Sequence, residues 1–158
     1  MKRPPESFHP NIHYYKVGIH KENGVSEMFH KNGTVEEFEV KTLNQLIKEN
    51  KDEGKEITYL KIDVEGAELL CMNQWLKSDA LKNVQQFGIE IHNNGIPKNY
   101  LKQAFKQSVE FIQKLSQKHG LEIVAYNPNA HFGKKPGPQR KYYMMNDVLF
   151  VQKITEIE

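Results

Sequence analysis

A short run of strand-forming residues passes directly into a helical pattern near the middle of the chain. Residues 57–62 are rich in β-formers and follow a charged loop that contains Gly54. From Ala67 onward, apolar residues recur at helical spacing, with Leu70, Cys71 and Leu76 near one face. In α/β folds, ligands bind just beyond the carboxyl ends of strands. The junction between these two patterns is therefore the first candidate site.

Charged residues and a glycine occupy this junction. In the simplest interpretation Asp63 caps the helix and Glu65 lies in its first turn, with no chemical role for either. Two details favour a functional interpretation instead. Lys61 and Asp63 share one face of a strand that otherwise looks buried, where charge is unfavourable unless it is paired or used. Gly66 replaces a better helix former, which predicts a close approach to the backbone.

The next strand predicted along the chain, Val84–His92, supplies the second candidate site at its end. Glu90 and His92 point to the same side of it, and consecutive strands usually lie side by side. We therefore expect one rim that gathers four side chains: Asp63, Glu65, Glu90 and His92.

Three interpretations of this rim stay open. A carboxylate and an imidazole can take a proton from a substrate hydroxyl. The same side chains can bind a divalent cation, although no distinctive metal-ligand spacing is present and we predict no metal. In the third interpretation Glu90 and His92 are solvated or paired with Lys61.

The segment 60–68, LKIDVEGAE, resembles the signature of the FkbM-like methyltransferase families, which are class I S-adenosylmethionine-dependent enzymes with a Rossmann-like sheet. Lys41-Thr42-Leu43 is similar to the family's entry to the preceding helix. Residues 86–92 resemble the strand that follows. The resemblance covers about residues 15–92.

This resemblance implies methyl transfer from the sulfonium of S-adenosylmethionine to a nucleophile, here an oxygen acceptor of unidentified small-molecule or glycan type. Asp63 or Glu65 would orient the substrate or the cofactor amine, and Glu90 or His92 would assist deprotonation. The Gly-rich turn that binds this cofactor is not found, because none of the glycines before the signature lies between a strand and a helix as Gly-x-Gly. We therefore expect a chain that is N-terminally truncated relative to the family, lacking its cofactor half.

The remaining patterns predict an α/β, Rossmann-like fold with a largely parallel sheet flanked by helices. An N-terminal hairpin is expected from strands at Ile12–His20 and Val25–Phe29. Further expected elements are a strand at 35–40, a short helix capped by Thr42, a helix at Tyr100–His119 stopped by Gly120, and strands at Leu121–Tyr126 and Asn146–Val151. We expect an irregular segment at 1–10, one domain at 11–153 and a tail at 154–158.

Composition adds limits on partners and location. With 158 residues and a net charge of +2, the chain fits one domain without a charge bias toward nucleic acid. The basic run at 134–141 contains Pro and Gly and no aromatic residue, which is typical of a solvated loop. No apolar run is long enough to span a membrane and no signal peptide is present, so cytoplasmic location is the default expectation. Cys71 is expected in the core.

Three functions are compatible with these patterns. The favoured one is a methyltransferase-like domain, inactive if its cofactor half is missing. The alternatives are a non-catalytic α/β binding module derived from a methyltransferase, and a metal-assisted hydrolase that uses Asp63, Glu65, Glu90 and His92.

Overall fold

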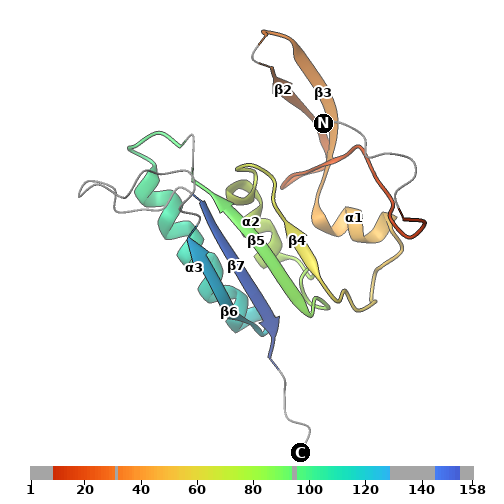
Figure 1. Cartoon of the computed structure of the whole chain (residues 1–158), viewed down its shortest axis with the longest axis vertical. Helices are drawn as coiled ribbons and strands as arrows, with labels where there is room; N and C mark the ends of the chain where they lie inside the picture. The colour runs from red at the N-terminus through yellow and green to blue at the C-terminus, as the bar shows by residue number, and fades with distance from the viewer. Residues whose placement is uncertain (1–8, 31, 94–95, 129–144, 154–158) are drawn as a thin grey trace, which may run out of the picture.

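The computed structural model of the chain describes residues 9–30, 32–93, 96–128 and 145–153 (Figure 1). The basic run at 134–141, the tail at 154–158 and most of the irregular segment expected at 1–10 lie outside these ranges. The helices and strands, in chain order, are β1 (Gly18–Ile19), β2 (Gly24–Phe29), β3 (Val35–Lys41), α1 (Leu43–Glu49), β4 (Leu60–Ile62), α2 (Glu68–Lys77), β5 (Gln86–His92), α3 (Leu101–His119), β6 (Leu121–Pro128) and β7 (Met145–Gln152).

The larger sheet has the strand order β4-β5-β7-β6. Strands β4 and β5 pair in parallel, whereas β7 lies between β5 and β6 and pairs antiparallel with both. Consequently β4, β5 and β6 share one direction and β7 alone opposes them. The α/β class is confirmed, but the expectation of largely parallel pairing is wrong, because the last strand inserts between two strands that would otherwise pair in parallel.

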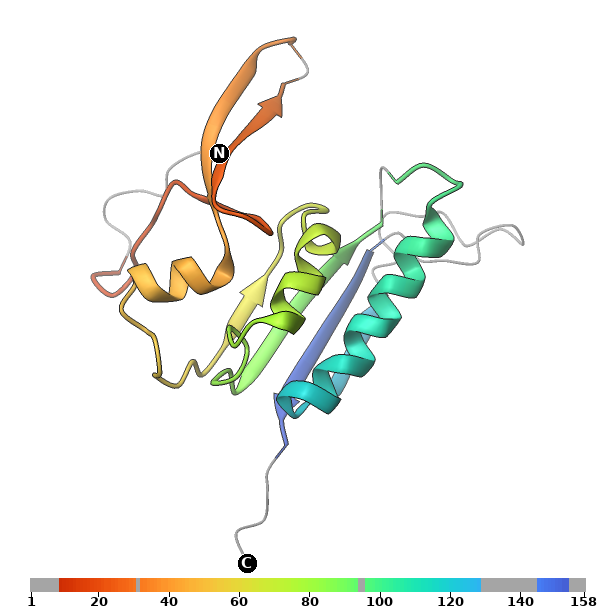
Figure 2. The same cartoon turned by 180° about the vertical axis from the view of Figure 1, so that it is seen from behind.

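Helices α2 and α3 lie together on one face of this sheet, so in the described part of the chain they do not flank both faces (Figure 2). The side chains between the helices and the sheet form the core. Trp75 of α2 packs against Phe111 of α3 with ring centroids 6.0 Å apart. Beneath them, Phe87 and Phe150 stack across β5 and β7 at 5.8 Å. Cys71 is fully buried in this core, as predicted.

Strand β5 has two different faces. Phe87, Ile89 and Ile91 alternate along it and are buried on the helix side. The residues between them lie on the other face, which the two helices leave uncovered. There the hydroxyl of Tyr59 lies over Gly88, so a Cβ added at Gly88 would require the Tyr59 side chain to move. The alternation therefore places Glu90 on the uncovered face of the sheet.

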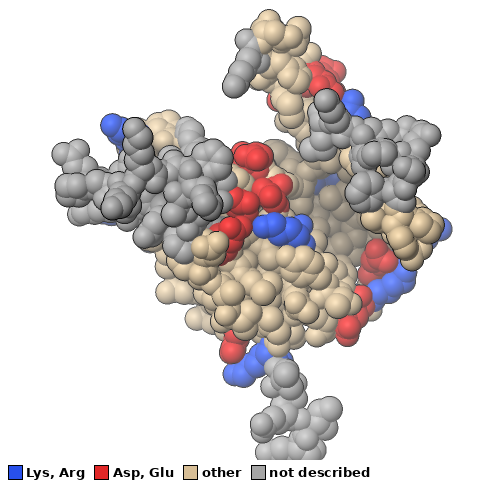
Figure 3. Space-filling view, in the orientation of Figure 1, with Lys and Arg blue, Asp and Glu red and all other residues tan. Residues whose placement is uncertain are grey.

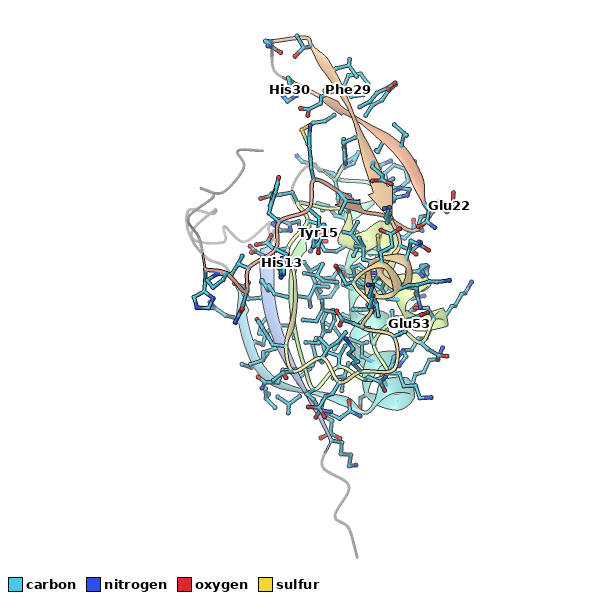
Figure 4. The ribbon with its side chains drawn as sticks, turned by 90° about the vertical axis from the view of Figure 1, so that its right-hand side faces the viewer. His13, Tyr15, Glu22, Phe29, His30 and Glu53 are labelled. Atoms are coloured by element: carbon cyan, nitrogen blue, oxygen red, sulfur yellow. The ribbon has the colours of Figure 1, made fainter. Side chains whose placement is uncertain are left out.

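The N-terminal sheet has the order β1-β3-β2 and forms an arm beside the larger sheet (Figure 1). Its hairpin joins β2 to β3, not Ile12–His20 to Val25–Phe29 as expected, and β1 pairs in parallel with β3. Gly33 adopts φ 83°, which favours glycine and turns the chain at this point instead. Figure 4 shows Phe29 and His30 near the far end of the arm, where Phe29 is 75% exposed.

Two helix boundaries follow from local chemistry. The N-cap prediction for Thr42 is confirmed, since its Oγ1 accepts a hydrogen bond from the Gln45 N–H at 3.2 Å. Leu43, the first residue of α1, is buried in the same core as α2 and the larger sheet. Gly120 ends α3 with φ 67°, as expected for a left-handed cap. No helix in the described ranges has both the length and the apolar character to cross a membrane.

The end of α3 yields a prediction about acid stability. His119 is buried there, and burial, followed by the nearby Lys118 charge, lowers the pKa of its imidazole, while Asp79 opposes the shift. The unfolded chain therefore binds more protons than the folded chain as pH falls through about 6.5, the ordinary value, so stability should fall with it. His119→Gln should lose less free energy of unfolding than the parent chain between pH 7.5 and 5.5, measured by urea unfolding.

His13→Gln supplies the control variant, because His13 is exposed and lies outside the core. An His119→Gln variant with the parent's pH dependence would contradict the role assigned to this imidazole.

Candidate functional site

Two consecutive residues with positive φ separate β4 from α2. Glu65 has φ 52° and Gly66 has φ 107°, so the helix begins at Glu68, and the interpretation that places Glu65 in its first turn is wrong. The N-cap is Ala67, which makes no side-chain cap, and the capping role considered for Asp63 is therefore wrong. Among the described residues none approaches Gly66 closely, since a Cβ there would meet nothing within 4 Å. Its backbone conformation explains the glycine.

The buried side chain of Glu68 stabilises the turn before α2, which has no N-cap side chain. Its side chain is completely buried, and its two oxygens accept hydrogen bonds from the backbone N–H groups of Val64 at 2.8 Å and Gly66 at 2.9 Å. Its Oε1 also lies 3.0 Å from Nδ1 of His92, at the end of β5. One carboxylate therefore fixes the turn, the start of α2 and the orientation of an imidazole.

His92 is the centre of the site. It is 1% exposed, and its Nδ1–H donates to Glu68, so Nε2 faces the remaining acidic side chains. Carboxylate oxygens of Glu65, Glu90 and Asp63 lie 3.6, 3.7 and 3.8 Å from Nε2. The structure thus brings all four predicted residues together. We call Asp63, Glu65, Glu90 and His92 the rim.

The rim ranges from buried to exposed. The Glu90 side chain is 13% exposed, that of Asp63 44% and that of Glu65 82%. In Figure 3, acidic groups gather at one end of the uncovered sheet face, with a basic group beside them. The rim therefore has a buried imidazole as its floor and carboxylates that reach solvent.

A third strand contributes to this cluster. Asp147 of β7 lies opposite Glu90 in the register, and its Oδ1 is 3.6 Å from Nζ of Lys61. Lys61, considered above as a partner of Glu90 or His92, contacts Asp147, and its charge also acts on Glu90. Burial, then the charges of Asp147 and Asp63, raise the pKa of Glu90, while His92 and Lys61 act in the opposite direction.

Sequence reasoning missed Glu68 and Asp147. Glu68 carried a usable signal, because it falls on the same helical stripe as Met72 and Trp75, both fully buried. An acidic residue on an apolar stripe predicts a buried partner. Asp147 gave no such signal, since its position depends on the insertion of β7 beside β5.

A second concave region lies elsewhere and has a structural explanation. A cavity of about 460 Å³ sits between the C-terminal halves of α2 and α3, with Lys77, Lys114 and Lys118 among its lining residues. Lys118 donates to the carbonyl of Leu76 near the end of α2. Lysines near helix C-termini stabilise the carbonyls that lack helical partners, so this cavity needs no ligand to explain its charge.

Comparison with known proteins gives one match. The family model described as "Methyltransferase FkbM domain" matches residues 4–123, which include β4, β5 and the whole rim. Searches of the curated proteins and of the solved structures found no significant match.

The buried carboxylate can be tested through stability. Glu68→Ala leaves two backbone N–H groups and the His92 Nδ1–H buried without their acceptor. Removing one partner of such a buried network typically costs about 3–5 kcal/mol. The free energy of unfolding, measured with urea, should fall by that order, and less for Glu68→Gln, which keeps an acceptor oxygen.

Glu65→Ala is the matched control, because the 82% exposed Glu65 side chain should contribute within about 0.5 kcal/mol. A loss below about 1 kcal/mol in Glu68→Ala would contradict the central position given to this carboxylate.

Proposed function

Because this chain belongs to the FkbM-domain methyltransferase family, we propose that it takes part in S-adenosylmethionine-dependent methyl transfer to an oxygen acceptor, with the rim as the acceptor side of the site. The chain is a methyltransferase-like domain. The cofactor, the acceptor class and a Rossmann-like parentage of the sheet are part of the proposal.

The observation that carries the proposal is the place of the rim at the ends of two adjacent parallel strands. Asp63 follows β4 directly, and Glu90 and His92 lie at the end of β5, which pairs with it. This is where α/β sheets bind ligands. The orientation of His92 by a buried Glu68 is typical of an imidazole held ready for proton transfer.

Each rim residue has a role in the proposal. Asp63 and Glu65 reach solvent and hold cationic parts of the bound molecules, such as the amine of the cofactor. Glu90 and His92 face the hydroxyl of the acceptor and take up its proton as the oxygen becomes a nucleophile. S-adenosylmethionine would supply an electrophilic methyl group on its sulfonium.

The described residues fit only some groups of that cofactor. The carboxylates of the rim suit its positively charged groups. No described strand runs into a helix through a Gly-x-Gly turn, the arrangement that, by resemblance to the family, would hold its methionine and ribose portions. We therefore assign no residue to the remainder of the cofactor and derive no step from it.

Backbone strain at Glu65 supports a functional rim. A non-glycine residue in the left-handed region costs roughly 1–2 kcal/mol, and Glu65 sits there with a side chain that is 82% exposed. Such exposure leaves little packing to offset the strain. Strain of this kind gathers at ligand sites, where the side chain is kept for what it binds.

Titration calorimetry of the purified chain with S-adenosylmethionine tests the function, in buffer containing a chelator. We expect a dissociation constant in the micromolar range, about −8 kcal/mol. Asp63→Asn should weaken binding by about tenfold or more, because it removes a charge-assisted contact to the amine. Glu122→Gln, an exposed carboxylate on β6, should leave binding unchanged.

Absence of binding by a chain that circular dichroism shows to be folded would reject the proposal for this chain. That result would favour a non-catalytic binding module.

Glu65→Gly separates strain from function. The variant should be as stable as the parent chain or more stable by up to about 1 kcal/mol, since glycine adopts positive φ freely. At the same time its binding of S-adenosylmethionine should weaken. Lys51→Gly is the matched control, because Lys51 also has a positive φ, 61°, but lies away from the rim.

Urea unfolding and calorimetry on the two variants provide the measurements. Equal effects of Glu65→Gly and Lys51→Gly on binding would show that Glu65 is not kept for a ligand.

A further inference from the structure

The environment of His92 Nε2 is unusual for a buried nitrogen. Because Nδ1–H donates to Glu68, a neutral imidazole carries its lone pair on Nε2. Carboxylate oxygens of Glu65, Glu90 and Asp63 lie 3.6, 3.7 and 3.8 Å from this atom, beyond hydrogen-bond distance. A lone pair that faces carboxylate oxygens in a buried place is repelled unless a positive charge lies between them.

The carboxylates around Nε2 do not come within hydrogen-bond distance of it. An imidazolium N–H draws a carboxylate oxygen to about 2.7–2.9 Å. The shortest separation from Nε2 is 3.6 Å, to the exposed Glu65, and Glu90 and Asp63 lie at 3.7 and 3.8 Å. The distances are too long for hydrogen bonds.

The distances between Nε2 and the carboxylate oxygens match the spacing of ligands around a small ion. Nitrogen and oxygen ligands lie about 2.0–2.2 Å from an ion such as Zn²⁺, so two of them at the tetrahedral angle are about 3.5 Å apart. One donor atom from each of Asp63, Glu90 and His92 lies within 4.8 Å of the other two. The side chains need to move little to place all three in contact with one ion.

We propose that Asp63, Glu90 and His92 bind one divalent cation, with Nε2 as the nitrogen ligand. The buried Glu68 completes the arrangement, because metal-binding histidines donate their other ring N–H to a carboxylate or carbonyl. The His92 side chain is 1% exposed and aimed into the cluster, which distinguishes the site from a group of surface acids.

The ligand set selects the kind of cation. An imidazole nitrogen favours Mn²⁺, Fe²⁺ or Zn²⁺ over Mg²⁺ or Ca²⁺, which prefer oxygen alone. Three protein ligands also leave at least one coordination position open. The site therefore has the composition of a catalytic metal centre rather than a closed structural one.

This inference rests on the proposed function in one respect, since it places the acceptor at the same rim. The acceptor's hydroxyl oxygen would occupy the open position, and the charge of the ion would increase the acidity of that hydroxyl. Its O–H bond then breaks and the proton passes to the exposed Glu65 carboxylate and to water. With the ion bound, Glu90 and His92 act as ligands instead of accepting the proton themselves.

Metal binding by the whole chain tests the proposal without a methyl-transfer assay. The chain is stripped with a chelator, dialysed and titrated with MnCl₂ by calorimetry, with thermal unfolding followed in parallel. We expect one Mn²⁺ per chain and a higher midpoint of unfolding. Spin-echo modulation of the bound Mn²⁺ should reveal a directly bound imidazole nitrogen.

Asp63→Asn and Glu90→Gln should each weaken Mn²⁺ binding at least tenfold, whereas Glu122→Gln on β6 should not. Failure of the folded chain to bind Mn²⁺ or Zn²⁺ at 1 mM would overturn the proposal, as would binding that neither rim variant affects. The titration with S-adenosylmethionine is done in chelator. Its outcome therefore does not depend on whether the cation site exists. Undiminished methyl transfer in chelator would support direct proton acceptance by Glu90 and His92. It would contradict a role for the ion in the reaction.

Discussion

The buried contact between Glu68 and His92 is the interaction on which the rest of the site depends. Glu68 has no exposed surface, and its oxygens bond to two backbone N–H groups of the turn and to the imidazole at the end of β5. A carboxylate in such a place is stable only because its acceptor sites are filled. One side chain therefore ties the end of β4, the start of α2 and the end of β5 into a single geometry.

The charge of the rim follows from that geometry. Three carboxylates face one imidazole nitrogen, and the nearby cation Lys61 contacts Asp147 of β7. The rim therefore carries an excess of negative charge over a partly buried floor, which attracts positive groups. A cofactor amine and a divalent cation both meet this electrostatic requirement, at neighbouring parts of the same rim.

The two faces of the larger sheet have different roles: one packs the core and the other carries the candidate site. The face toward α2 and α3 holds the apolar core, including Trp75, Phe87 and Phe111. The opposite face carries Glu90 and Asp147 at the end of the sheet where the rim lies. Because side chains alternate along a strand, β5 can serve the core and the rim at once. A shift of one residue in the register of β5 would exchange these roles and bury the carboxylate of Glu90 under the helices.

Local sequence patterns determined much of this protein. They identified the strand–helix junction, the cap at Thr42, the long α3 and its end at Gly120, and the family through residues 60–68. These features depend on neighbours within a few residues, which the sequence displays directly. The tertiary structure alone decided the place of β7, the hairpin partner of β2 and the burial of Glu68 against His92. Each of these is a contact between distant parts of the chain, and such contacts are selected by packing and by the pairing of buried charge, which no local pattern specifies.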